Sequence, residues 1–382
     1  MFPTLGHLIN YLFGLNINFP MPTYGFVLVM AFVTAGIILK FSLKRMESQG
    51  KLASHKSEVL ISGPINYFDI IISGVFYFII GYKIFGIAFN YDLFTEDINA
   101  YIFSAQGSLI AGLILAAMGS GYGYWQATQN FSSELIYEDK DILPHELTMN
   151  IVMVAMLSGI IGAKVFDILE NFSRFLKDPL DALFSAGGFT FYGGLIAGFF
   201  AVWYYIRKKN IPALTLMDAA APAILGAYAV GRLACMLSGD GCWGIPNPDP
   251  KPEWLAMIPN WLWAFDFPHN VINEGSRILS CSGDYCHQLD VPVFPTPLYE
   301  SILSAIFFLT VWFAQNKVKT TGVIFFIAIM LNGFARFFIE KIRVNNLYEI
   351  GTSHITQAEI ISSSLVLIGI MGIIILSKLK KK

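Results

Sequence analysis

Two arginines interrupt stretches that are otherwise apolar enough to lie inside a membrane. Arg232 stands in AYAVGRLAC and Arg336 in NGFARFFIEKIR. Charged side chains at such depth are costly and usually serve a function. A guanidinium group is a planar fork of donors that fits a phosphate, and the anion available there is a phospholipid headgroup. The two arginines therefore predict a binding site for an anion. The alternative is a structural role, with Arg232 snorkelling to the headgroups.

Charged residues near Arg336 repeat at helical spacing. Glu340 and Arg343 follow it at i+4 and i+7, which predicts that all three lie on one face of a single helix. We expect Glu340 to orient Arg336.

Several polar or glycine-rich segments are predicted at the same level as the two arginines. They are Pro22–Gly25 with Tyr24, Phe191–Leu195 with Tyr192, Gly193 and Gly194, Pro295–Glu300 with Tyr299, and Ser353–Gln357 with His354. Taken singly, each has a simpler explanation, since glycines four apart often pack helices together and prolines often begin helices. Their common level predicts a polar cavity that opens toward the outer leaflet.

A glycine-rich segment with an acidic residue, Ser238–Gly244, follows Arg232. Its glycines predict a sharp turn with Asp240 at its centre. All four cysteines, Cys235, Cys242, Cys281 and Cys286, lie in or beside the loop 238–296. A ring closed by Cys281 and Cys286 is one arrangement, but the connectivity cannot be read from sequence. With no CxxC pair and only His287 nearby, we expect neither a metal nor another cofactor.

The composition of the chain predicts the kind of structure that holds these residues in place. Of 382 residues, 55% are hydrophobic and only 14% are charged, against about 25% charged in soluble domains. Because a span needs about 20 mostly apolar residues, we predict an all-α, polytopic transmembrane bundle of about nine spans. They are 24–41, 68–90, 101–120, 150–166, 187–206, 212–237, 298–315, 321–339 and 358–377. Seven or eight follow if 68–90 and 101–120 are miscounted.

Lysine and arginine bias predicts the orientation of these spans. Four basic clusters fall on one side if the N-terminus is outside: Lys40–Lys56, Arg207–Lys209, Lys317–Lys319 and Lys378–Lys382. That side is predicted to be cytoplasmic, with the C-terminus. We expect residues 1–23 to form an outer interfacial segment and 24–382 the membrane domain, which includes a helical hairpin over 60–149 and an outer loop over 238–296.

The order of these motifs resembles the prolipoprotein diacylglyceryl transferases of bacterial membranes. The resemblance rests on Tyr24-Gly25, FYGGL (191–195), GRLACMLSGDGCWG (231–244), PTPLYE (295–300) and RFFIEKIR (336–343). It covers roughly 20–41 and 150–377, and its most specific part is the GR…WG segment.

The resemblance implies an enzyme of the bacterial inner membrane whose active site faces outward. It would move the diacylglyceryl group of phosphatidylglycerol to the lipobox cysteine thiol of preprolipoproteins, the first step of lipoprotein maturation, with membrane lipid but no nucleic acid as a partner. Arg232 then corresponds to the phosphatidylglycerol-binding arginine, Arg336 to a second essential arginine and Tyr24 to a functional tyrosine. Among the remaining candidates, substrate binding is expected of Gly193, Gly194, Tyr299, Glu300, Glu340 and Arg343.

Three departures from the family pattern affect this expectation. Tyr192 stands where many members have histidine, and an ordinary tyrosine pKa near 10 makes it a poor base. The GR…WG signature is one residue longer, with Asp240 in place of its acidic residue. Residues 60–149 have no counterpart in a seven-helix member. We therefore rank Asp240 first as acceptor of the thiol proton, Tyr192 second and His354 third.

Two other functions fit parts of the pattern. Paired intramembrane arginines also suit a transporter of an anionic lipid or metabolite, although no internal repeat is visible. A catalytically inactive relative that only binds lipid would explain the missing histidine. Acyl-chain preference, oligomeric state and the role of 60–149 cannot be read from the sequence.

Overall fold

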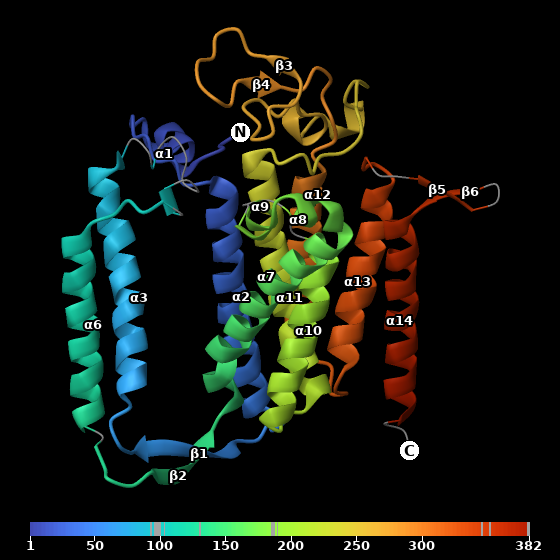
Figure 1. Ribbon diagram of the computed structural model, residues 1–382. Coiled ribbons are helices and arrows are strands. Elements are labelled where there is room, and N and C mark those ends of the chain that lie inside the picture. Colours follow the sequence, from blue (N-terminus) through green and yellow to red (C-terminus); the bar gives the residue numbers. More distant parts are fainter. Residues whose placement is uncertain are drawn as a thin grey trace. The chain divides into compact units, whose positions relative to one another are not determined.

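The computed structural model describes residues 1–91, 94, 101–102, 104–129, 131–184, 188, 190–344, 347–350 and 353–379. Within that part, nine helices have at least 18 residues (Figure 1). They are α2 (Thr23–Ser48), α3 (Tyr67–Gly86), α6 (Leu109–Gln129), α7 (Thr148–Glu170), α10 (Phe191–Lys208), α11 (Ala213–Ser238), α12 (Thr296–Ala314), α13 (Val323–Glu340) and α14 (Gln357–Leu379).

Seven of these helices are long and apolar enough to cross a membrane, all except α6 and α10. The second half of α6 reads GSGYGYWQATQ, and α10 ends in YYIRK, so polar residues lower the hydropathy of both. The prediction of a polytopic helical bundle is confirmed, whereas nine spans are not.

Shorter elements connect the long helices. The helical ones are α1 (Leu5–Phe13), α8 (Phe172–Lys177), α9 (Pro179–Phe184), η1 (Ile87–Phe89), η2 (Pro144–Leu147), η3 (Glu253–Leu255) and η4 (Asn260–Leu262). The strands are β1 (His55–Ser62), β2 (Ile136–Ile142), β3 (Ser276–Arg277), β4 (His287–Gln288), β5 (Leu347–Ile350) and β6 (Ser353–Thr356), paired antiparallel as β1–β2, β3–β4 and β5–β6. The sequence did not reveal β1–β2, because α3 and α6 separate the two strands and no turn dipeptide marks the pair.

The chain divides into two compact units. The second unit consists of 13–21 and 54–142, and it contains α3, α6, β1 and β2. The predicted start of a helix at residue 101 is wrong, because α6 begins at Leu109. The Lys83 ammonium donates to the carbonyls of Tyr101, Ser104 and Gln106 at 2.7–3.0 Å, and residues 104–108 lie outside a helix.

The first unit is built around α11. This helix follows Pro212 and ends at Gly239, whose φ of 67° is the left-handed cap conformation that glycine adopts without strain. Pro222 inside the helix has no N–H for the carbonyl of Asp218, four residues earlier. The Gln315 amide donates to that carbonyl at 2.7 Å instead, so α12's C-terminal cap residue repairs the break in α11.

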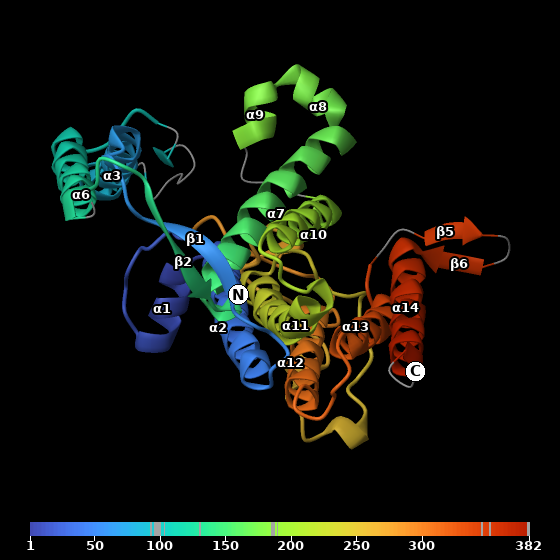
Figure 2. The ribbon, with the colours of Figure 1, turned by 90° about the horizontal axis from the view of Figure 1, so that it is seen from below.

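The apolar core of this unit lies between α11, α12 and α13. Ala221 and Leu225 from α11 meet Val311 from α12, and Ile324 and Ala328 from α13. Figure 2 shows α11 with α2, α12 and α13 around it. A small side chain at each crossing lets these helices approach closely, as is usual for helices in lipid.

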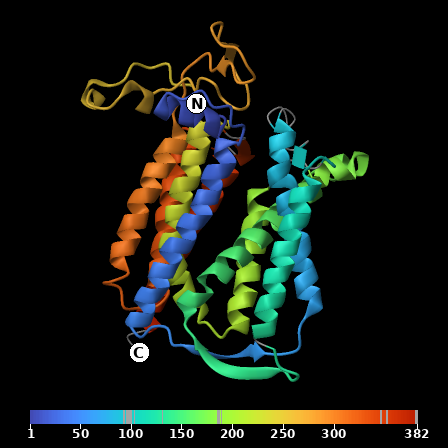
Figure 3. The same cartoon turned by 90° about the vertical axis from the view of Figure 1, so that its left-hand side faces the viewer.

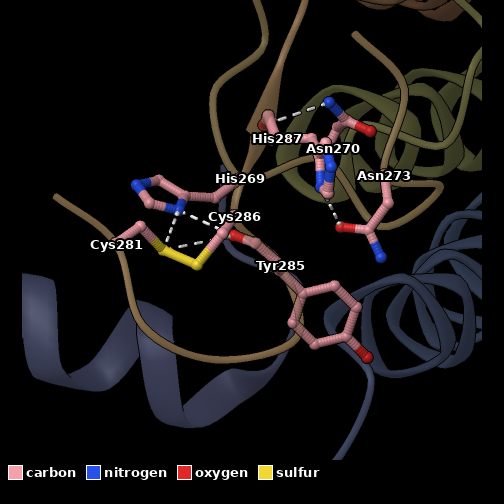
Figure 4. The surroundings of a disulfide bond; sticks show 7 residues. All are labelled: His269, Asn270, Asn273, Cys281, Tyr285, Cys286 and His287. Carbon is pink, nitrogen blue, oxygen red and sulfur yellow. Dashed lines mark hydrogen bonds between the residues drawn. A yellow bond between two sulfur atoms is a disulfide. The ribbon is translucent and has the colours of Figure 1, made fainter. Parts of the chain in front are cut away.

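A loop segment over 239–295, between α11 and α12, covers one end of this unit. Its own apolar cluster contains Trp243, Phe267, Leu289 and Val293. Cys281 and Cys286 form a disulfide, which is the ring that the sequence left as one of the possible arrangements, and the His269 Nδ1–H beside it donates to the Tyr285 carbonyl at 2.8 Å (Figure 4). Cys235 and Cys242 are free thiols.

The basic clusters of the first unit lie at the end opposite the loop segment. Their described members lie in the C-terminal parts of α2, α10 and α14 or just after α2, α10 and α12, while the loop segment follows the last turn of α11 (Figure 3). Arg45 donates to the Trp312 carbonyl at 2.8 Å and Lys51 to the Val318 carbonyl at 3.2 Å, which joins two of these clusters. The described lysines and arginines of these clusters therefore lie at one end of the first unit, as the lysine and arginine bias predicts.

Candidate active site at the loop-segment end of the bundle

Glu300, in the first turns of α12, lies at the centre of three arginines. Its Oε2 accepts the Arg232 Nε–H. Its Oε1 lies 3.2 Å from Arg336 Nη1 and 3.4 Å from Arg343 Nη1. Arg336 also pairs with Glu340, Nη2 to Oε2 at 3.1 Å, as its i+4 spacing predicts. We call these five residues the arginine cluster.

The arginine cluster has one positive charge in excess. Three guanidinium groups face two carboxylates, and both glutamates are buried while the arginines keep 12–27% of their side chains exposed. An isolated buried charge is costly, so a monoanion is the ligand that would complete the balance. A phosphodiester has that charge, and guanidinium groups bind it through paired hydrogen bonds.

Tyr228 connects two members of the cluster and was missed from the sequence. Its hydroxyl donates to Glu300 Oε2 and accepts from Arg232 Nε at 3.1 Å. Asn332, also missed, lines a cavity of about 20 Å³ together with Glu300 and Arg336, which is room for one water. Each of these residues precedes an arginine by four positions, and that helical spacing is the signal that could have found them.

Arg343 reaches the cluster by a route different from the predicted one. The expectation that one helix face holds Arg336, Glu340 and Arg343 is wrong, because α13 ends at Glu340. Arg343 instead forms a bridge with Gly244, in which Ile245 N donates to the Ile342 carbonyl at 2.9 Å. A Cβ on Gly244 would lie 2.4 Å from that same carbonyl oxygen, so the glycine of the WG dipeptide is required for this contact.

Asp240 lies in the turn after α11 and contacts Cys242. Its Oδ1 accepts the Cys242 N–H at 3.2 Å, and its Oδ2 lies 3.5 Å from Cys242 Sγ. Arg232 Nη1 lies 3.5 Å from Cys235 Sγ, which places this turn beside the arginine cluster. The Cys235 thiol, together with Arg232 and Arg343, lowers the pKa of Cys242 to about 7, against the opposing effects of burial and Asp240.

Tyr24 and Tyr299 occupy different positions relative to the cluster. Tyr24, at the start of α2, lies within electrostatic range of Arg232, Cys235 and Asp240. The Tyr299 hydroxyl donates instead to the Leu262 carbonyl in the loop segment, and its ring lines an apolar cavity of about 450 Å³. Tyr299 therefore fastens the loop segment to α12, whereas Tyr24 lies near Arg232 and the turn that contains Asp240.

Gly193 and Gly194 pack against α7. A Cβ on Gly193 would lie 2.4 Å from Phe166 Cβ, and one on Gly194 would lie 2.9 Å from the Gly159 carbonyl oxygen. The expectation that these glycines clear room for a headgroup is not supported, since helix packing accounts for both. Tyr192, in the same turn, keeps 40% of its surface exposed. The side chain of His354 lies outside the described residues.

Comparisons with known proteins give the chain a family context. The family model described as prolipoprotein diacylglyceryl transferase matches residues 112–375. A protein of Leptospira interrogans named phosphatidylglycerol–prolipoprotein diacylglyceryl transferase is 30% identical over 219 residues, which are 51% of this chain and 61% of the relative. Proteins of the same name from Clostridium botulinum are 28% identical over 264 residues (69% and 87%) and, in strain 657, 30% identical over 229 residues (59% and 78%). The match thus spans 61% of the length of the Leptospira relative.

Proposed function

Because the chain belongs to the prolipoprotein diacylglyceryl transferase family, we propose that it transfers the diacylglyceryl group of phosphatidylglycerol to the lipobox cysteine of preprolipoproteins. The observation that supports this most is the single excess positive charge of the arginine cluster, which matches one phosphodiester. The names of its relatives in Leptospira and Clostridium agree with this function.

The proposed reaction breaks the bond between a glycerol carbon and a phosphate oxygen. The acceptor thiolate attacks that carbon, the C–S bond forms, and the electron pair of the C–O bond goes to the departing glycerol phosphate. Arg232, Arg336 and Arg343 bind the phosphate and stabilise the charge that grows on it. Glu300, Glu340 and Tyr228 hold these guanidinium groups in place, so the donors need little reorganisation during the reaction.

The proton of the acceptor thiol needs a destination, because a free thiol has a pKa near 8.5. Asp240 is our first choice for taking part in its removal, since its turn lies beside Arg232. Tyr192 is second. Asp240→Asn with a normal transfer rate would remove Asp240 from this role.

The charge distribution supports an orientation in the bacterial inner membrane. The basic ends of α2, α10, α12 and α14 would face the cytoplasm by the positive-inside bias. The loop segment, its disulfide and the N-terminus would then face the outer side, where disulfides are stable. In this proposal 60–149 is a helical insertion into the transferase domain.

Arg232→Lys tests the proposed function most directly. Purified protein is given vesicles of phosphatidylglycerol and a labelled lipobox peptide, and diacylglyceryl-peptide is measured by mass spectrometry. Loss of a paired donor to the leaving phosphate is expected to lower the transfer rate about a hundredfold, or about 3 kcal/mol. Arg45→Lys is the matched control, since Arg45 is a partly buried arginine at the opposite end of the bundle that stacks on Trp312.

Two results would contradict the proposal. One is wild-type protein that binds phosphatidylglycerol but modifies no peptide, which would favour an inactive lipid-binding relative. The other is Arg232→Lys with undiminished transfer. A transport function is less well supported, because the charged groups gather at one end of the bundle rather than at its middle.

A further inference from the structure

Three potential metal ligands meet beside the arginine cluster. Cys235 Sγ, Cys242 Sγ and a carboxylate oxygen of Asp240 all lie within 4.8 Å of one another. Zinc binds sulfur at about 2.3 Å and carboxylate oxygen at about 2.1 Å, so ligands of one tetrahedral ion are about 3.5–3.8 Å apart. The 3.5 Å between Cys242 Sγ and Asp240 Oδ2 already matches that spacing. We call these three residues the thiol cluster.

The backbone holds the thiol cluster together without help from a metal. Cys235 lies in the last turn of α11, and the chain reverses at Gly239 and Gly241, where φ is 67° and 86°. The Thr296 hydroxyl donates to the Cys242 carbonyl at 2.9 Å. This hydrogen bond fixes the segment after the turn to the first residue of α12. The cluster is therefore a preformed arrangement on two helix ends.

The charges around the thiol cluster suit a divalent cation. Two thiolates and a carboxylate carry three negative charges, which a dication would reduce to one, and Arg232 Nη1 lies 3.5 Å from Cys235 Sγ. Thiolate ligands select a soft or borderline ion such as Zn²⁺ over Mg²⁺ or Ca²⁺. Cys235 is buried, whereas Asp240 and Cys242 are half-buried, so one side of the ion would stay open.

We propose that Cys235, Asp240 and Cys242 bind a Zn²⁺-type cation whose fourth position takes the acceptor thiol. Three protein ligands with one open position are typical of catalytic zinc. A thiol that coordinates zinc loses its proton outright, so the ion would supply the thiolate that Tyr192 is poorly suited to generate. The thiolate then attacks the glycerol carbon as described, and the released proton passes to solvent or to the glycerol phosphate.

The role of the ion in activating the acceptor thiol rests on the proposed transferase function, whereas the binding of the ion does not. In this arrangement Asp240 acts as a ligand rather than as the proton acceptor. The ion would also lie next to Arg232, and so beside the phosphate of the bound lipid. The acceptor thiolate and the leaving group would thus meet at the boundary between the two clusters.

Metal content tests the site independently of activity. The full chain, purified in detergent, is incubated with Zn²⁺, freed of excess ion and measured by mass spectrometry for metal. We expect about one Zn²⁺ per chain in the wild type and less than about a tenth of that in Cys235→Ser, Cys242→Ser and Asp240→Asn. The double variant Cys281→Ser/Cys286→Ser is the matched control and is expected to keep its ion.

Cobalt gives a second readout that does not depend on how well a serine variant folds. Co²⁺ bound to the wild type is expected to show sulfur-to-metal charge-transfer absorption. Asp240→His, which replaces one zinc ligand by another, is expected to retain this absorption together with Zn²⁺. Wild-type protein that binds neither ion, or that isolates with a Cys235–Cys242 disulfide and no metal, would overturn the site.

The catalytic part is tested by removing the ion. Chelated protein is expected to lose at least about tenfold in transfer rate and to regain it with Zn²⁺. Full activity of metal-free protein would overturn the role in thiol activation while leaving the transferase function intact. Zn²⁺ bound at the cluster of a protein that transfers nothing would instead refute the proposed function and leave the metal site standing.

Discussion

Glu300 and Asp218 are two buried carboxylates at opposite ends of α11, and they are stabilised in different ways. Their exposures are nearly equal, 5% and 3%, so burial does not distinguish them. Glu300 is surrounded by side-chain cations from three parts of the chain. Asp218 accepts backbone N–H groups, from Gly322 at 2.6 Å and Phe325 at 2.8 Å.

The difference separates a binding site from a structural support. Backbone amides at the start of α13 satisfy the Asp218 carboxylate through hydrogen bonds and add no cation that could bind an anionic ligand, so this residue caps a helix in another part of the chain. The arginine cluster keeps one excess cation and partly exposed guanidinium groups. A buried acid surrounded by more cations than it can neutralise therefore indicates an anion site, while an acid on a helix N-terminus indicates packing.

Glu300→Gln is expected to have the largest effect. Three arginines would then face a neutral amide, and loss of one partner from a buried ion network costs about 3–5 kcal/mol of unfolding free energy. Thermal or denaturant unfolding in detergent measures it. Phosphatidylglycerol should restore part of the stability, since a ligand that binds the folded state stabilises it.

The control for Glu300→Gln is Glu359→Gln, because Glu359 is also a buried carboxylate but pairs with Lys341, whose side chain is 58% exposed. An ion pair with an exposed cation contributes about 1 kcal/mol or less, and the oxygen of the glutamine can still accept the Thr356 N–H that Glu359 accepts. If both variants lose the same stability, or if phosphatidylglycerol restores neither, the excess charge at Glu300 does not form an anion site.

Asp218→Asn is expected to lower the unfolding free energy by about 2 kcal/mol. The amide has one acceptor oxygen for two backbone donors, and a buried donor left unsatisfied costs about 1–3 kcal/mol. Phosphatidylglycerol should give no selective rescue, and the transfer rate per folded molecule should stay that of the wild type. A variant that folds normally but transfers slowly would remove the distinction between the two carboxylates.

The sequence revealed the members of the anion site better than their arrangement. Arg232 and Arg336 stand out because charge inside an apolar stretch is rare whatever the fold. The convergence of Arg343 on Glu300 depends on the bridge between Gly244 and Arg343, a contact between distant segments that no periodicity encodes. The thiol cluster was hidden for the same reason, since positive-φ glycines, not a CxxC pair, bring its cysteines together.

The helical fold was predictable because a membrane requires long apolar helices, and hydropathy records them directly. Predicted helix boundaries were wrong where single polar contacts decide them, as at Lys83, whose ammonium binds carbonyls of the segment that precedes α6. The repair of α11 by Gln315 also could not be predicted, although Pro222 indicated that some donor was needed.

Tyr228→Phe is expected to cost about 1.5 kcal/mol, seen as an approximately tenfold lower kcat/KM for transfer. The hydroxyl joins Arg232 to Glu300, and a hydrogen bond to a charged group contributes about 1.5–3 kcal/mol. The variant should unfold nearly as the wild type does, because three arginines still hold Glu300. A loss of a hundredfold or more would show that Tyr228 contacts the reacting groups rather than orienting Arg232.

Tyr192→Phe is expected to have the smallest effect, a transfer rate within about twofold of the wild type. Its turn of α10 packs on α7 through Gly193, and the thiolate would be generated at the thiol cluster instead. Tyr192→His tests the same point from the other side, since a histidine has an ordinary pKa near neutrality and would serve as a base if this position faced the thiol. We expect no gain from it; a marked gain would move the proton chemistry from the end of α11 to the start of α10.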